Sequence, residues 1–273
     1  MKILFFGDIF GRPGRNFLKD NLLDLKKKHK PDFVIANVEN MAHGRGVTKN
    51  TLNELNEIGI FDAYTSGDHI WDTEVAKELV KDSSNALLRP HNLSGKQPGK
   101  GHMVVQNGLK RLLVVNLIGE VFMDKLEASS PFHGLDNILD MYTIDPEEEE
   151  KELIDGIFVD FHAEATSEKR VLGFYADGRV SVLAGTHTHV PTSDEQILPK
   201  GTAYVTDVGM VGPYNSSIGL DATGLIEEYL TGVKQKREIG DDPSVEIGAI
   251  VVELGKDGLA KNIEHIREII TLD

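Results

Sequence analysis

Two histidines separated by one residue, His187 and His189, lie directly after a strand-like apolar run. Residues that alternate just beyond a strand can reach two adjacent metal ions through neutral imidazole nitrogens. Taken alone, a histidine pair of this spacing is more often part of an ordinary polar turn. Gly185 before the pair and the position at a strand end favour metal binding, so the pair is a candidate part of a metal site.

Carboxylate, amide and imidazole groups also follow other apolar runs. Glu39 and Asn40 follow FVIANV, where a carboxylate is costly unless a positive charge compensates it. The two oxygens of Glu39 can bridge two cations and the carbonyl of Asn40 can complete one coordination shell; the alternative is a polar surface loop. Asp8 comes after KILFF and could instead cap the next helix. His162 follows IFVDF and could instead be a hydrogen-bonded core histidine.

The joint pattern outweighs these separate alternatives, because five strand ends in one chain carry such groups. In parallel α/β sheets ligand sites lie beyond the carboxyl ends of the strands, so the groups should converge. Mixed oxygen and nitrogen ligands suit Mn²⁺, Fe²⁺ or Zn²⁺. The sequence therefore predicts a metal site at one sheet edge, built from Asp8, Glu39, Asn40, the Asp68-His69 pair, His162, His187 and His189.

Two glycine-rich stretches border these groups. The first, 7–15, lacks the Gly-Lys-Ser/Thr ending of a P-loop and the spacing of a dinucleotide fingerprint. Its glycines favour a tight turn, and Arg12 is a candidate phosphate contact, with a solvated arginine as an equal alternative. The second, 206–214, either has a structural role, which we favour, or lines the pocket and supports a ligand histidine. Trp71 is expected to pack in the core.

The periodicity of apolar residues predicts an α/β protein whose strands are joined by helices. A hairpin is expected around Asn107-Gly108 and another at Asp257-Gly258. No repeat, low-complexity tract or linker divides the chain, so residues 1–273 should form a single domain, in which two sheets pack together and helices flank them. Strands are expected at 2–6, 33–38, 63–65, 101–105, 110–115, 157–161, 180–184, 203–206, 245–254 and 263–270, and helices at 15–29, 48–58, 72–80, 221–230 and from 145 to 151.

The amino-acid composition indicates which classes of binding partner to expect. The formal net charge of −15 disfavours binding of duplex nucleic acid, but bound cations can still attract a small anionic ligand. The chain has no cysteine, no signal-peptide pattern at its start and no apolar stretch near the ~20 residues of a membrane span, so a cytoplasmic protein without a membrane partner is expected. The oligomeric state is left open, a homo-oligomer included.

Six motifs together resemble the YmdB-like family of calcineurin-like metallophosphoesterases, which are bacterial 2′,3′-cyclic-nucleotide phosphodiesterases. The resemblance runs through nearly the whole chain and implies a four-layer αββα sandwich. DFHAEATSEK and GTHTHVPT are the most specific of its motifs. The six are GDIFGRPGR (7–15), NVENMAHG (37–44), GDHIWD (67–72), DFHAEATSEK (160–169), GTHTHVPTSD (185–194) and TDVGMVGPY (206–214).

The resemblance also implies roles for the site residues. It implies one metal ion held by Asp8, Asn40 and His189, a second held by Asp68, His162 and His187, Glu39 bridging the two, and His69 as catalytic acid. Phe10 stands where the general phosphoesterase pattern has a histidine, which is itself typical of this group. Asp68 stands where the family pattern has asparagine. Its extra negative charge predicts a less electrophilic site, with lower activity or a changed metal preference.

The expected activity is hydrolysis of cyclic nucleotides, 2′,3′-cyclic and also 3′,5′-cyclic, by a hydroxide that bridges two divalent ions, Fe, Mn or Zn. Protonation of the ribose leaving group by His69 would speed this reaction. A cyclic nucleotide or another small phosphodiester is the expected partner, and RNA ends are not excluded as substrates. One alternative is a phosphomonoesterase such as a nucleotidase, because two metals do not distinguish monoesters from diesters. The other is a non-catalytic metal-binding regulator.

Overall fold

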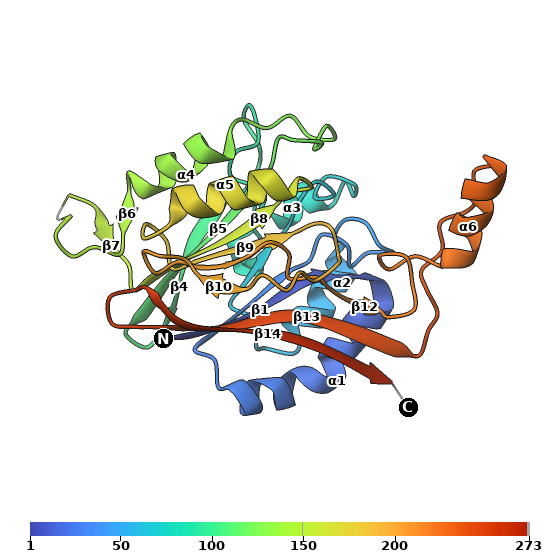
Figure 1. The fold of residues 1–273 in the computed structure, drawn as a ribbon, viewed down its shortest axis with the longest axis horizontal. Helices are drawn as coiled ribbons and strands as arrows, with labels where there is room; N and C mark the ends of the chain where they lie inside the picture. The colour runs from blue at the N-terminus through green and yellow to red at the C-terminus, as the bar shows by residue number, and fades with distance from the viewer. Residues whose placement is uncertain (149, 272–273) are drawn as a thin grey trace.

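Two six-stranded sheets pack face to face, and helices cover the outer face of each, as the computed structural model shows for residues 1–148 and 150–271 (Figure 1). The helices α1 and α2 lie against one sheet, and α4 and α5 lie against the other. The predicted four-layer αββα sandwich is confirmed.

The first sheet contains the N-terminal and C-terminal strands. β1 lies at its centre, parallel to β2 and β12 and antiparallel to β13. The strand order is β14 (Ala260–Thr271), β13 (Ser244–Leu254), β12 (Met210–Pro213), β1 (Lys2–Ile9), β2 (Phe33–Asn37) and β3 (Ala63–Thr65). The helices packed on its outer face are α1 (Gly11–His29), α2 (Lys49–Asn56) and the short α3 (Ala76–Leu79).

The second sheet is built from the middle of the chain. β5, β8, β9 and β11 run parallel, and β4 and β10 close the two edges antiparallel to their neighbours. The strand order is β10 (Gln196–Ile197), β11 (Ala203–Val205), β9 (Val182–Thr186), β8 (Gly156–His162), β5 (Lys110–Ile118) and β4 (His102–Asn107). Its outer helices are α4 (Pro131–Leu139) and α5 (Thr166–Ala176).

The remaining elements lie outside the two sheets. β6 (Tyr142–Thr143) and β7 (Glu152–Leu153) pair with each other, and a 3₁₀ turn spans Ser83–Asn85. The helix α6 (Ala222–Thr231) projects from the body of the molecule and buries none of its residues (Figure 1). Among the described residues, no helix combines the length and apolar character needed to cross a membrane.

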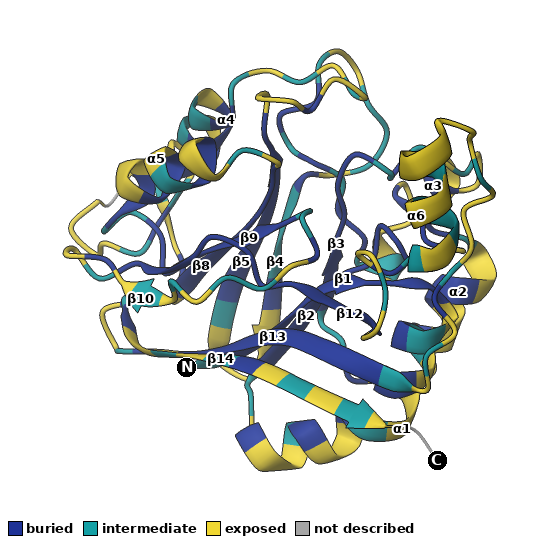
Figure 2. Cartoon of the chain, turned by 45° about the vertical axis from the view of Figure 1, so that its right-hand side comes forward, coloured by how far each residue is buried: buried dark blue, intermediate teal, exposed yellow. Residues whose placement is uncertain are grey.

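The core has three apolar layers because side chains alternate between the two faces of each strand. In β1, Leu4 and Phe6 face α1 and α2, whereas Ile3 and Phe5 face the second sheet. The pattern recurs in β8, where Phe158 lies between the sheets and its neighbours pack under α4 and α5. Both sheets are therefore buried on both faces over most of their area (Figure 2), which explains the continuous apolar runs of the sequence.

Several predicted elements differ from the structure. The predicted helix from 145 to 151 is wrong: apart from residue 149, which lies outside the described residues, this segment forms turns. The helix predicted over 72–80 is confined to Ala76–Leu79. Strand β1 continues through Asp8 to Ile9, and α1 begins at Gly11 rather than at residue 15. Both hairpins and the helix after Asp221 are confirmed.

Candidate metal centre and adjoining pocket

The predicted ligands come together at the edge where parallel strands of both sheets end. Asp8 lies in β1 just after a register shift at Gly7, and His162 is the last residue of β8. Glu39 and Asn40 follow β2, Asp68 follows β3, and His187 and His189 follow β9. All of these side chains are buried except that of His187, which is partly exposed. The predicted convergence of strand ends is confirmed.

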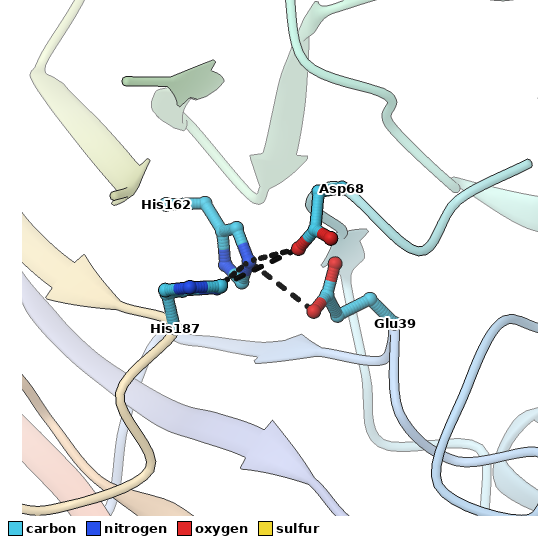
Figure 3. Close-up of side chains that lie close together, drawn as sticks. All are labelled: Glu39, Asp68, His162 and His187. Atoms are coloured by element: carbon cyan, nitrogen blue, oxygen red, sulfur yellow. Dashed lines mark hydrogen bonds and ion pairs between the residues drawn. The ribbon is translucent and has the colours of Figure 1, made fainter. Parts of the chain in front are cut away.

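Four of these residues form a tight group (Figure 3). One donor atom from each of Glu39, Asp68, His162 and His187 lies within 4.8 Å of the others. Nε2 of His162 lies 3.2 Å from Oε1 of Glu39 and 3.3 Å from Oδ1 of Asp68. It also lies 3.0 Å from Nδ1 of His187. Two carboxylates and two imidazoles at this spacing can surround one divalent cation.

Asp8, Asn40 and His189 offer a second set of donor atoms beside the first. Oδ1 of Asp8 and Oδ1 of Asn40 are buried and, among the described residues, lack a hydrogen-bond partner. The Nδ2 amide of Asn40 donates to the Gly44 carbonyl, which leaves its oxygen facing the site. His189 donates from Nδ1 to the Ile218 carbonyl, and its Nε2 lies 3.8 Å from Oδ1 of Asp8. Buried oxygens without donors are expected where a cation binds, so these residues fit a metal ion.

Hydrogen bonds behind His162 fix the orientation of its ring. Nδ1 of His162 lies 3.0 Å from Oγ1 of Thr186, and Thr186 donates its hydroxyl proton to Asp160 at 2.7 Å. The hydroxyl must therefore accept from Nδ1–H, which leaves Nε2 as the nitrogen that faces Glu39 and Asp68. Asp160 also accepts from Asn37 and Thr65, and burial raises its pKa to about 7.

Without a metal, the acidic groups act on His162. Burial by itself would lower the pKa of His162, but Glu39, Asp68 and Asp8 around it raise that pKa well above 6.5. Burial opposes ionisation of Asp68 as well, yet hydrogen bonds from His162 and His187 hold the pKa of Asp68 well below its usual range. A protonated imidazole thus occupies the position of positive charge that a cation would take.

Metal binding is therefore expected to release about one proton per protein near neutral pH, because only neutral His162 can bind a cation. Affinity should rise with pH until the raised pKa is passed. In chelator, the stability that His162 contributes should be full below 6.5, its unfolded value, and be lost as pH rises through the folded pKa. Calorimetric titration in buffers with different ionisation enthalpies measures the proton count; a binding heat that is the same in all buffers would contradict the prediction.

The loop that carries His187 and His189 has a strained backbone held by a buried ion pair. Both histidines have positive φ angles, 102° and 65°, which non-glycine residues rarely adopt. Lys169 of α5 donates to the carboxylate of Asp207 and to the Thr186 carbonyl, both at 2.8 Å. Asp207 also accepts from the N–H of Thr188, the residue between the two histidines. The glycine-rich stretch 206–214 thus supports the histidine loop through the carboxylate of Asp207, which holds the backbone of that loop.

His69 lies at the mouth of the site, between the ligand group and a neighbouring pocket. Its backbone N–H donates to Oε2 of Glu39, and Nδ1 of its ring donates to Oδ2 of Asp72 at 2.7 Å. Since the carboxylate can only accept, Nε2 is the nitrogen left for the substrate. Lys125 also contacts Nδ1 of His69 and Asp72. Neither Asp72 nor Lys125 is among the site residues predicted from the sequence.

The pocket beside His69 has a volume of about 150 Å³ and carries positive charge. Arg45 and Arg237, both exposed, belong to its lining. Phe10, which packs edge-on against His189 with ring centroids 5.5 Å apart, forms an apolar part of the wall. The predicted phosphate contact Arg12 is exposed on the first turn of α1 and is not among the lining residues. Trp71, predicted to be in the core, is partly buried against apolar clusters.

Comparison with known proteins identifies the family. The sequence model described as "YmdB-like protein" matches residues 4–266. The 2′,3′-cyclic-nucleotide 2′-phosphodiesterase of Bacillus subtilis (strain 168) is 42% identical over 266 residues, which are 97% of this chain and 96% of that protein. A crystal structure described as a novel phosphatase of Mycoplasma pneumoniae is 32% identical, with a TM-score of 0.89 over 100% of this chain and 94% of that one.

The fold is also found at low sequence identity. A 5′-nucleotidase precursor of Thermus thermophilus is 11% identical, with a TM-score of 0.54 over 100% of this chain and 54% of that one. That likeness concerns the fold alone. The family match covers nearly all of the chain, and the Bacillus subtilis relative is similar over almost its full length. The chain therefore belongs to the YmdB-like family.

Proposed function

We propose that this protein is a metal-dependent phosphodiesterase that hydrolyses cyclic nucleotides, the 2′,3′-cyclic and also the 3′,5′-cyclic kind. The observation that carries the proposal is the pair of adjacent donor sets at the mouth of a positively charged pocket. One set has two buried oxygens for which the described part of the chain offers no hydrogen-bond donor. The name of the Bacillus subtilis relative supports the substrate class.

The ligand residues divide between two divalent ions, Fe, Mn or Zn. Asp8, Asn40 and His189 would hold one, Asp68, His162 and His187 the other, and Glu39 would bridge them. Bound ions of this kind lower the pKa of water and neutralise the phosphate. Glu39 has one oxygen beside His162 and the other beside the backbone of His69, which places it between a proposed metal ligand and the proposed acid.

His69 is the proposed general acid. Opening a cyclic phosphodiester expels a ribose alkoxide, which is a poor leaving group at neutral pH and needs a proton. The bond from Nδ1 to Asp72 leaves Nε2 as the ring nitrogen available to donate a proton, and His69 lines the pocket. The proton would therefore pass from Nε2 to the ribose oxygen while the rest of the nucleotide lies in the pocket.

The proposal is tested by adding Mn²⁺, Fe²⁺ or Zn²⁺ to metal-depleted protein. We expect metal-dependent hydrolysis of 2′,3′-cyclic AMP and 3′,5′-cyclic AMP, and much slower hydrolysis of 3′-AMP and p-nitrophenyl phosphate. His187→Ala should abolish it, and His133→Ala, which changes an exposed histidine of α4, should not. Faster hydrolysis of the monoesters would establish a phosphomonoesterase instead. Stoichiometric metal binding without hydrolysis of any ester would indicate a regulator.

Arg45 and Arg237 are expected to bind the substrate rather than take part in bond cleavage. They line the pocket beside the ligand residues, and Arg237 is held by Glu228 of α6 at 3.0 Å. Replacing either by alanine should raise KM about 5- to 20-fold for a cyclic nucleotide and leave kcat nearly unchanged. Steady-state kinetics of both variants measure kcat and KM separately. A fall in kcat without a rise in KM would mean that the arginines act in bond cleavage rather than in substrate binding.

A further inference from the structure

Lys125 reaches the site from the connection between β5 and α4, and the proposed chemistry has no role for it. Its ammonium lies 2.8 Å from the Asp72 carboxylate and 3.6 Å from Oδ2 of Asp68, and it contacts Nδ1 of His69. The Lys125 ammonium therefore contacts three residues of the segment 68–72, which supplies the proposed metal ligand Asp68 and the proposed acid His69. The pKa of Asp72 reflects these contacts. Burial by itself would raise that pKa, but Lys125 and His69 together lower it below its usual value.

The two oxygens of Asp68 are divided between the metal-ligand group and Lys125. Oδ1 lies 3.3 Å from Nε2 of His162 and 3.5 Å from Nδ1 of His187. Oδ2 points the other way, 3.6 Å from the Lys125 ammonium and 3.9 Å from Nε2 of His69. An asparagine could still offer one oxygen to the ligand group, but its NH₂ would then face an ammonium, and both groups are donors. Lys125 thus fits an aspartate at position 68.

We propose that Lys125 is a positioning residue matched to Asp68, which it neutralises while it holds Asp72, the acceptor for Nδ1–H of His69, in place. The inference rests on the proposed two-metal site. Two divalent ions with the carboxylates of Asp8, Glu39 and Asp68 leave one net positive charge, and Lys125 restores a second. The local charge around the phosphate is therefore the same as with an asparagine and no lysine.

This arrangement makes metal affinity and turnover respond in opposite directions. An ammonium close to a ligand oxygen repels a second cation, so Lys125→Met should tighten Mn²⁺ binding, by about 10-fold. The same change leaves Asp68 uncompensated and frees Asp72 and His69, so hydrolysis of 2′,3′-cyclic AMP should fall by about 10-fold or more. A purely structural lysine would weaken both properties together.

A double-mutant cycle on the full chain tests the pairing. Mn²⁺ affinity is measured by competition with a chelator for the wild type, K125M, D68N and the double variant. D68N should weaken binding, because Lys125 then faces the metal ions without a carboxylate beside it. K125M should therefore tighten binding in the D68N background by a factor at least about 5-fold larger than in the wild type. K125R should resemble the wild type. K81M is the matched control, because Lys81 makes an exposed ion pair with Glu78 on the nearby helix α3.

Either of two results would overturn the pairing. One is a K125M affinity within about 2-fold of the wild type, and the other is effects of D68N and K125M that simply multiply. Thermal unfolding of each variant in chelator shows whether it is folded; because Lys125 is partly exposed in a loop, we expect folded variants. The affinity cycle can be read even if no ester is hydrolysed, so failure of the proposed function and failure of the pairing are separate outcomes.

Discussion

Replacing His69 by alanine is expected to lower kcat for 2′,3′-cyclic AMP by about 10²- to 10⁴-fold, which is the usual contribution of a general acid. Metal stoichiometry should not change. His69 donates to Glu39 through its backbone N–H, and alanine retains that N–H. The ring is not part of the group formed by Glu39, Asp68, His162 and His187. Turnover and metal content, measured on the same preparation, check both parts of the prediction.

The choice of leaving group separates acid catalysis from a role in folding. Bis(p-nitrophenyl) phosphate releases p-nitrophenolate, which leaves without protonation, so His69→Ala should hydrolyse it at close to the wild-type rate. His43→Ala is the matched control, because His43 is exposed and lines the same pocket. Equal losses on both substrates would mean that His69 positions the site rather than donating a proton.

The ligand positions could be predicted because a parallel strand fixes where its last residues lie. The apolar runs before Asp8, Glu39, His162 and His187 are strands that end at one edge. The position of each residue after its strand was therefore enough to predict that they lie together. The residues that orient them could not be found in this way. Lys125 lies in a loop without periodicity, and Asp160 reads as one polar residue inside a buried strand.

Two missed elements have specific physical causes. The helix α5 buries Glu168 and Lys169 and exposes Val171 and Phe174, so its apolar residues do not follow the helical period that marks an amphipathic helix.

The first turn of α1 contains Gly11, Pro13 and Gly14, residue types that are typical of a loop. Proline costs little there, because the first N–H groups of a helix have no partner within the helix. A Cβ at Gly14 would lie only 2.1 Å from the Val211 carbonyl oxygen, so glycine permits close packing of α1 on β12.

The buried Lys169 of α5 is also expected to have a large effect on stability. Lys169→Met is expected to destabilise the protein by about 3–5 kcal/mol, because it leaves the carboxylate of Asp207 buried without its cation. For a chain of this size that corresponds to a fall in Tm of roughly 5–9 °C. Thermal unfolding in chelator measures the loss, and Lys19→Met, at an exposed lysine of α1, should change Tm little.

The same substitution should weaken metal binding even in molecules that remain folded. Lys169 and Asp207 hold the backbone on either side of His187 and His189, whose positive φ angles persist only while the surroundings enforce them. Adding Asp207→Asn to Lys169→Met removes the unpaired charge and should recover part of the stability. It should not recover Mn²⁺ affinity, because the lysine that anchors the Thr186 carbonyl is still missing. If stability and affinity recovered together, the ion pair would act on the histidines only through overall folding.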